Sequence, residues 1–310
     1  MLTTVLSLLL AVPAARAQKV IATVQVPSEP AGIAADPIAR RVYVCSLESS
    51  DVSVLDSRSN TLLAETLTLG ISLTAVAVDP TARRLYAADR DLPRVTLFAT
   101  NNRTLLGRVS VGEDPSALLV DPESSRVFVT SRGTGTVSVL DGSTSRLVTT
   151  VTVGRAPAGM AYDPTARRLF VANEGDDTLS VIDTTRFRVT ATLNVGPEPA
   201  AAAFDRATAR LFVARRGDDR VAVVDTATHR VLSTIPTGAL PSALAFSPRT
   251  GRLYVADTLD GTLTVLDTRT GARLALLPVG AAPSALSLDE LAARLFVANR
   301  DDSTVTVVEE

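Results

Sequence analysis

Residues 241–280 read PSALAFSPRTGRLYVADTLDGTLTVLDTRTGARLALLPVG. This stretch contains short runs of aliphatic, β-branched and aromatic residues, and each run is bounded by Pro, Gly, Asp or Ser, which favour turns. The runs are 241–246, 252–256, 262–266 and 273–277. None is long enough for a typical globular helix, so the stretch predicts four consecutive β-strands.

The same unit occurs seven times. A turn followed by Arg, an aliphatic residue and an aromatic residue is found at 36–43, 79–86, 121–128, 163–170, 205–212, 247–254 and 289–296. After a first spacing of 43 residues, the units follow one another every 42 residues. A period of about 40 to 50 residues with four strands per unit is typical of the blades of a β-propeller.

The two ends of the chain predict how the ring closes. The seventh unit stops after a third strand at 304–308, while a strand at 19–26 precedes the first unit and resembles a fourth strand. Pairing these segments completes the last blade and leaves no blade with a missing strand. We therefore predict an all-β fold with one domain at 18–310, a seven-bladed propeller of four antiparallel strands per blade with a 3+1 closure.

The N-terminus predicts export. Residues 2–12 are largely apolar, Pro13 interrupts them, and Ala15-Arg16-Ala17 is a small-x-small pattern that signal peptidase could cut before Gln18. The apolar run is too short to span a membrane. We interpret 1–17 as a signal peptide, although 1–4 contains no Lys or Arg. The mature protein is expected to be periplasmic, cell-surface or extracellular, with no integral membrane segment.

Composition argues against several classes of function. The formal net charge is -2, so no overall positive field attracts nucleic acid. The chain has one Cys, one His and no Trp, which argues against disulfides, Cys/His zinc sites and haem attachment. We predict no metal and no cofactor. Calcium binding by the Gly-Asp-Asp segments 175–177 and 217–219 is a weak alternative.

Residues that recur in every blade are interpreted as structural. An Arg stands five residues after the first turn residue of each unit and is expected to pair with the Asp that begins that turn in six blades. The positions are Arg41, Arg84, Arg126, Arg168, Arg210, Arg252 and Arg294. An Asp between the third and fourth strands, as in Asp183, predicts an Asx-turn. Cys45 occupies an Ala or Thr position and is interpreted as a small buried residue.

The second strands carry a family resemblance. The tetrads 170–173 (FVAN), 254–257 (YVAD) and 296–299 (FVAN), each followed by a third strand such as 178–183 (TLSVID), resemble the YVTN β-propeller repeat. The resemblance covers nearly the whole chain after 17. It implies a seven-bladed, exported or surface protein of the YncE-like kind, and it implies no particular reaction.

A candidate site lies where the blades differ. The residue after each tetrad is Leu47, Arg90, Arg132, Glu174, Arg216, Thr258 and Arg300. Arg215 ends a tetrad and Arg155 lies in a loop entering a blade. We predict that Arg90, Arg132, Arg155, Arg215, Arg216 and Arg300 surround a funnel mouth suited to a carboxylate, phosphate or sulfated glycan. The alternative is a solvated face, because aspartates such as Asp176, Asp218 and Asp301 occupy the same loops.

These observations favour a monomeric, non-catalytic scaffold that binds a small anionic ligand or a protein outside the cytoplasm. The alternative is a lactonase-like hydrolase or lyase acting at the same funnel. The only histidine, His229, is predicted in a turn on the opposite face, so we identify no catalytic residue.

Overall fold

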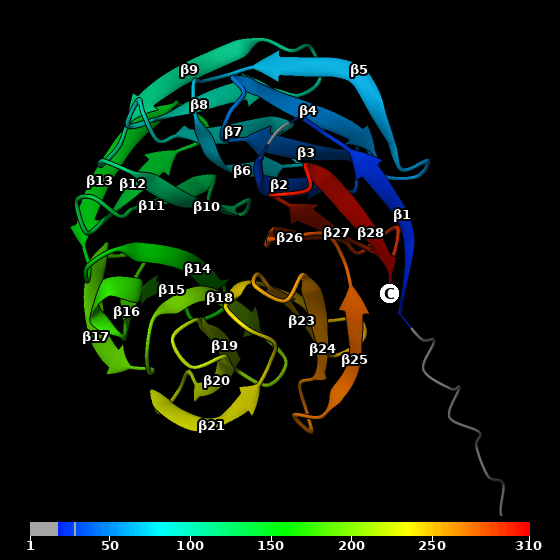
Figure 1. Cartoon of the computed structure of the whole chain (residues 1–310). Coiled ribbons are helices and arrows are strands. Elements are labelled where there is room, and N and C mark those ends of the chain that lie inside the picture. Colours follow the sequence, from blue (N-terminus) through cyan, green and yellow to red (C-terminus); the bar gives the residue numbers. More distant parts are fainter. Residues whose placement is uncertain (1–17, 28) are drawn as a thin grey trace, which may run out of the picture.

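The computed structural model describes residues 18–27 and 29–310, in which seven four-stranded antiparallel sheets form a ring (Figure 1). The predicted signal peptide lies outside the described residues. No helix in the described part is long and apolar enough to cross a membrane. The one helical element described is the 3₁₀ turn η1 (Glu174–Asp176), which the sequence did not predict.

The strands follow the predicted units. Blade 1 contains β2 (Pro30–Asp36), β3 (Arg41–Ser46), β4 (Asp51–Asp56) and β5 (Thr61–Thr68). Blade 2 contains β6 (Leu73–Asp79), β7 (Arg84–Asp89), β8 (Arg94–Ala99) and β9 (Leu105–Ser110). Blade 3 contains β10 (Pro115–Asp121), β11 (Arg126–Ser131), β12 (Thr136–Asp141) and β13 (Arg146–Thr152). Blade 4 contains β14 (Pro157–Asp163), β15 (Arg168–Asn173), β16 (Thr178–Asp183) and β17 (Arg188–Asn194).

The remaining blades repeat this pattern. Blade 5 contains β18 (Pro199–Asp205), β19 (Arg210–Arg215), β20 (Arg220–Asp225) and β21 (Arg230–Pro236). Blade 6 contains β22 (Pro241–Ser247), β23 (Arg252–Asp257), β24 (Thr262–Asp267) and β25 (Arg273–Pro278). Blade 7 contains β26 (Pro283–Asp289), β27 (Arg294–Asn299), β28 (Thr304–Glu309) and β1 (Lys19–Gln25).

The 3+1 closure is confirmed. The sheet order of blade 7 is β1-β28-β27-β26, so the first strand of the chain is the outermost strand of the last blade. Lys19 pairs with Glu309 and Gln25 pairs with Thr304. Figure 1 shows β1 and β28, from opposite ends of the sequence, side by side.

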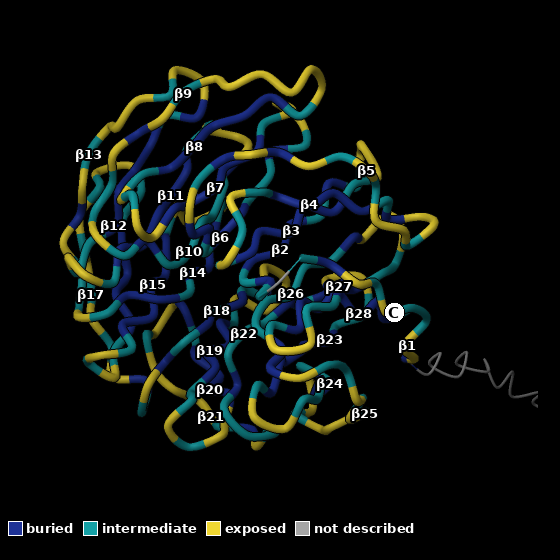
Figure 2. The backbone as a smooth tube through the Cα atoms, turned by 45° about the horizontal axis from the view of Figure 1, so that its top comes forward, coloured by how far each residue is buried: buried dark blue, intermediate teal, exposed yellow. Residues whose placement is uncertain are grey.

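The core lies between the blades (Figure 2). Each second strand contributes one buried aromatic residue, and Tyr86, Phe170 and Tyr254 are at most 1% exposed. The inner strands carry small residues because neighbouring backbones approach closely there. A Cβ added to Gly159 would lie 2.6 Å from Cα of Ala201 in the next blade. Cys45 is fully buried, which raises its pKa to about 12 and confirms its interpretation as a small core residue.

The predicted Asx-turns between third and fourth strands are confirmed, since Asp183 Oδ1 accepts the N–H groups of Thr185 and Arg186. The expected partner of the recurring Arg was wrong. Asp36 Oδ1 already accepts hydrogen bonds from the N–H groups of Ile38 and Ala39, at 3.0 and 2.8 Å, so it does not take Arg41. Arg41 instead pairs with Asp56 of the other turn at 3.2 Å.

In other blades the recurring Arg reaches the next blade. Arg168 donates to the Thr226 carbonyl at 3.0 Å, and Arg294 donates to the Ser57 carbonyl. These arginines are structural, as predicted, but several of them connect blades rather than hold the first hairpin of their own blade.

The ring has two faces. The loop face is the face formed by the connections between the second and third strands of each blade and between successive blades. The turn face is formed by the connections between first and second strands and between third and fourth strands. Chain direction in each blade places these two sets at opposite ends of the strands.

Candidate functional site

Three of the six predicted arginines meet in one hollow on the loop face. Arg90, Arg132 and Arg300 come from blades 2, 3 and 7 and line a cavity of about 330 Å³ together with Leu47 of blade 1. Its other lining groups include Asp114 and the hydroxyls of Thr74, Ser116 and Ser284. We call this cavity the arginine hollow.

The arginine hollow adjoins the central funnel. The funnel has a volume of about 380 Å³, is lined mainly by Ala, Gly and Ser of the seven inner strands, and shares Arg132 with the hollow. Arg216 also lines the funnel. The structure therefore brings four predicted arginines, Arg90, Arg132, Arg216 and Arg300, to two adjoining spaces.

Two guanidinium groups in the hollow retain unused hydrogen-bond donors. Nε of Arg300 is 3.1 Å from Asp301 Oδ1, and Nε of Arg90 is 3.6 Å from Asp91 Oδ1. Within the described residues the terminal Nη atoms of these two side chains donate no hydrogen bond. Since both are 43–48% exposed, their ion pairs contribute little to stability and leave donors for a ligand.

Glu174 bridges the other two arginines. Its Oε2 lies 2.5 Å from Nη1 of Arg132 and its Oε1 lies 3.1 Å from Nη1 of Arg216, so blades 3, 4 and 5 are joined at the funnel mouth. The Glu174 side chain is 14% exposed, and Nε of Arg216 is buried without a hydrogen-bond partner. Sequence reasoning placed Glu174 at the mouth but did not identify this bridge.

Arg155 and Arg215 lie apart from the hollow. Arg155 is 80% exposed and pairs with Asp176 at 2.5 Å, which lowers the pKa of Asp176. Arg215 is 13% exposed, pairs with Asp218 and covers Gly196.

The Gly-Asp-Asp segments are occupied by protein contacts. Asp176 and Asp218 hold these two arginines, while Asp177 and Asp219 accept backbone N–H groups of Glu198 and Leu240. Groups of three or more His, Cys, Asp or Glu side chains that could hold a metal are absent from the described residues.

The funnel wall presents hydroxyls that are already used as donors. Thr74, Ser116, Ser242 and Ser284 each donate to a proline carbonyl of the next blade at 2.7–3.1 Å. A hydroxyl that has donated its proton can still accept. The wall therefore offers acceptors to a ligand, while the arginines at the mouth offer charged donors.

Charge is unevenly divided between the two faces. Counting each connection from the last residue of one strand to the first residue of the next, the loop face carries eight Lys and Arg against seventeen Asp and Glu. The turn face carries twenty against thirteen. His229 lies in the turn between β20 and β21, on the turn face as predicted and away from the hollow.

With this geometry established, comparison with known proteins supports the fold alone. A solved structure titled "Kuenenia stuttgartiensis Hydrazine Synthase" superposes with a TM-score of 0.82 at 17% identity, covering 91% of this chain and 96% of that chain. No family model and no curated protein matches the sequence. The YVTN and YncE-like assignment therefore stays a prediction.

Proposed function

We propose that this protein is an exported, non-catalytic binding propeller that takes a small anionic ligand in the arginine hollow of its loop face. The observation that carries the proposal is the convergence of Arg90, Arg132 and Arg300 from three blades on one cavity, with hydrogen-bond donors of the terminal Nη atoms of Arg90 and Arg300 left unused within the described residues. Guanidinium groups bind carboxylate and phosphate oxygens through paired, charge-assisted hydrogen bonds.

The surrounding acidic loops favour a small ligand over a polymer. Charges farther apart than about 8 Å are largely screened at physiological ionic strength, so an anion inside the hollow interacts mainly with the three arginines, with Asp114 of the lining and with Asp91 and Asp301, which pair with two of the arginines. A long polyanion would also meet the excess of Asp and Glu on the rest of this face. We therefore favour a single carboxylate or phosphate group over a sulfated glycan chain.

The hydroxyl lining favours a ligand that also carries donors. Thr74, Ser116 and Ser284 line the hollow and have donated their protons to backbone carbonyls, so they accept from a ligand hydroxyl. Leu47 provides a small apolar contact. A hydroxy acid or an acidic sugar has the charge and the hydroxyls that fit this lining.

A thermal-shift screen of hydroxy acids, uronic acids and sugar phosphates tests the proposal. A ligand at about 100 times its Kd adds about 2.7 kcal/mol to the free energy of unfolding, which raises Tm by several degrees. Arg90→Ala and Arg300→Ala should abolish the shift, whereas Arg155→Ala, an arginine of the same face outside the hollow, should preserve it. A shift unaffected by both hollow variants would contradict this site.

Turnover separates the proposal from its alternative. Any compound that binds is incubated with the protein and followed by NMR for hydrolysis or elimination. Recovery of the unchanged compound is expected. Conversion that is lost in Arg90→Ala would instead support a hydrolase or lyase at the funnel. Mass spectrometry of the secreted protein tests export, with Gln18 as the expected first residue.

A further inference from the structure

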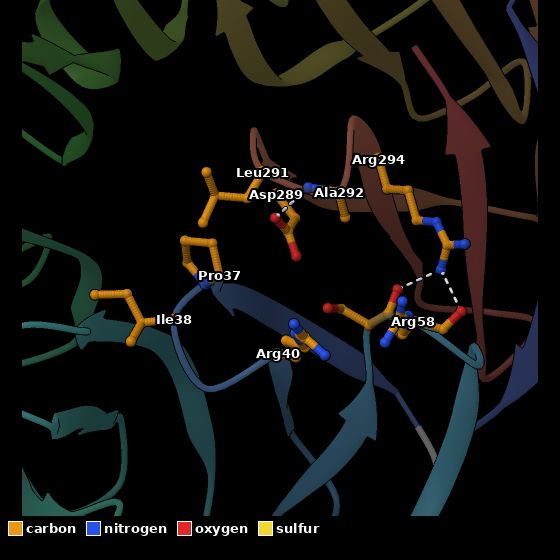
Figure 3. A pocket seen from close by; sticks show the side chains of 9 residues that line it. Pro37, Ile38, Arg40, Arg58, Asp289, Leu291, Ala292 and Arg294 are labelled. Carbon is orange, nitrogen blue, oxygen red and sulfur yellow. Dashed lines mark hydrogen bonds between the residues drawn. The ribbon is translucent and has the colours of Figure 1, made fainter.

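A second cavity lies on the opposite face, where blade 7 meets blade 1 (Figure 3). It has a volume of about 530 Å³ and is bordered by the first turns of both blades and the second turn of blade 1. The lining residues are Pro37, Ile38, Arg40, Ser57, Arg58, Asp289, Leu291, Ala292 and Arg294. We call it the closure cleft.

The closure cleft breaks the repeat with two exposed aliphatic side chains. Ile38 is 64% exposed and Leu291 is 77% exposed, and they occupy equivalent turn positions in the two blades that flank the cleft. The other blades carry Thr81, Glu123, Thr165, Ala207 and Arg249 at this position. Large apolar side chains at exposed positions beside a cavity are characteristic of a binding surface.

These side chains stand on rigid turns. Asp36 Oδ1 accepts the N–H groups of Ile38 and Ala39, and Asp289 Oδ1 accepts the N–H of Ala292 at 2.9 Å. Rigid presentation reduces the entropy lost on binding. The cleft is therefore formed before any partner arrives.

The charge of the cleft is positive. Arg40 and Arg58 are exposed, and neither forms an ion pair within the described residues. Arg294 donates to the Arg58 carbonyl and to Asn60 Oδ1, both at 2.8 Å, and so holds one wall in place. The only carboxylate in the lining is Asp289, which is 1% exposed. Glu290, beside Leu291 on the blade 7 side, is exposed, so the positive charge lies on the blade 1 side, at Arg40 and Arg58.

We propose that the closure cleft docks a segment of a partner protein in which an aliphatic or aromatic side chain is flanked by acidic residues. The apolar side chain enters between Ile38 and Leu291, and the flanking carboxylates pair with Arg40 and Arg58. A concave cleft with aliphatic walls and two unpaired guanidinium groups fits a side chain and its acidic neighbours better than it fits a flat lipid surface. This proposal does not depend on the arginine hollow, which lies on the other face.

A random-peptide display library selected on the full mature protein tests the proposal. Enriched peptides should combine Asp or Glu with Leu, Ile, Phe or Trp. A synthetic peptide of that consensus should bind about tenfold more weakly to Arg58→Ala and about fivefold more weakly to Ile38→Ser. Arg58→Ala retains the backbone groups that Asp56 and Arg294 contact, and Ile38 is exposed, so both variants should keep the wild-type Tm.

Substitutions at equivalent positions of other blades provide the matched controls. Arg269→Ala in blade 6, where the N–H of Arg269 binds Asp267 as that of Arg58 binds Asp56, and Thr81→Ser in blade 2 should bind the peptide as the wild type does. Enriched peptides without acidic residues, or equal binding to all four variants, would overturn the proposal. Two further measurements identify other occupants and would also overturn it. Self-association in sedimentation velocity that Ile38→Ser abolishes would identify a second copy of the chain as the occupant. Binding to phosphatidylglycerol vesicles that Arg58→Ala abolishes would identify a lipid surface.

Discussion

On the turn face a carboxylate usually finds its partners within its own turn, whereas Glu174 on the loop face finds them in two other blades. Asp163 Oδ1 accepts the N–H groups of Thr165 and Ala166, two and three residues away. Glu174 binds Arg132 and Arg216, each 42 residues away. The turn face thus repeats because its turns are satisfied locally, whereas the Glu174 bridge depends on which residues three successive blades place on the loop face.

The largest expected effect comes from the chain ends, which meet at the turn face. Deleting residues 18–26 removes β1 and exposes the edge of β28. Because blade 7 would then contain three strands, we expect the deletion to prevent cooperative folding of the whole ring. Circular dichroism during thermal unfolding measures this. A sharp transition near the wild-type Tm would show that the closure is dispensable.

A smaller effect is expected from a single carboxylate at the same end. The Glu310 side chain is fully buried and accepts from Arg249 at 2.7 Å and from the Tyr254 hydroxyl at 3.2 Å. Glu310→Gln should lower the free energy of unfolding by about 2 kcal/mol, since it weakens a buried, charge-assisted contact. Asp301→Asn on the loop face, where Asp301 is 59% exposed, should change it by less than about 0.5 kcal/mol. Equal losses in urea unfolding would contradict the difference that burial predicts between these two carboxylates.

Replacing Asp257 on the loop face should change the free energy of unfolding by a comparable amount but with the opposite sign. This buried carboxyl accepts from Thr262 and Thr264, while its Oδ1 has no hydrogen-bond partner. Burial, together with the nearby Asp260 carboxylate, raises the pKa of Asp257 to about 6. The folded state therefore prefers the protonated form, and stability falls as pH rises from about 4 to 6.

Asp257→Asn should remove that loss. At pH 7 the variant should be more stable than the wild type by about 2 kcal/mol, and at pH 4 the two should be similar, because the wild-type carboxyl is then protonated. Blade 4 already has Asn173 at this position, donating to Thr178 and Ser180. The reverse substitution Asn173→Asp should therefore lower stability at pH 7 more than at pH 4. Chemical denaturation of the wild type and both variants at pH 4 and pH 7 measures these differences. If each variant differed from the wild type by the same amount at both pH values, the raised pKa of Asp257 would be contradicted.

The smallest effect separates arginines of the two faces. Arg168→Ala removes the hydrogen bond to the Thr226 carbonyl in the next blade and should cost about 1 kcal/mol. Arg155→Ala removes an exposed pair on the loop face and should leave stability nearly unchanged. If urea midpoints moved equally, the connecting role of the recurring Arg would be wrong.

The repeat was sufficient to predict the blades, the closure and the two faces, because each depends on periodicity and on local turn chemistry. The partner of Arg41 was not predictable in the same way, since the two N–H groups that occupy Asp36 are set by turn geometry. The Glu174 bridge depends on blades being adjacent in space. Its signal was present in the sequence as Arg132, Glu174 and Arg216 at successive steps of 42 residues.

The separation of Arg155 and Arg215 from the hollow depends on side-chain competition. Both stand in loops of the predicted face, but an Asp one loop away or three residues ahead binds each of them first. A one-dimensional pattern places such residues on a face and does not decide which way their side chains turn.

The hydroxyls that donate to proline carbonyls of the next blade, together with the recurring arginines, also determine which boundary between blades should open first. The boundary between blades 7 and 1 has both contacts, from Ser284 to Pro30 and from Arg294 to Ser57. Between blades 1 and 2, Ala31 replaces the hydroxyl and Arg41 pairs within its own blade. Under mechanical load or in hydrogen exchange, the first gap should therefore open between blades 1 and 2, and the boundary between blades 7 and 1, beside the strand that closes the ring, should outlast it.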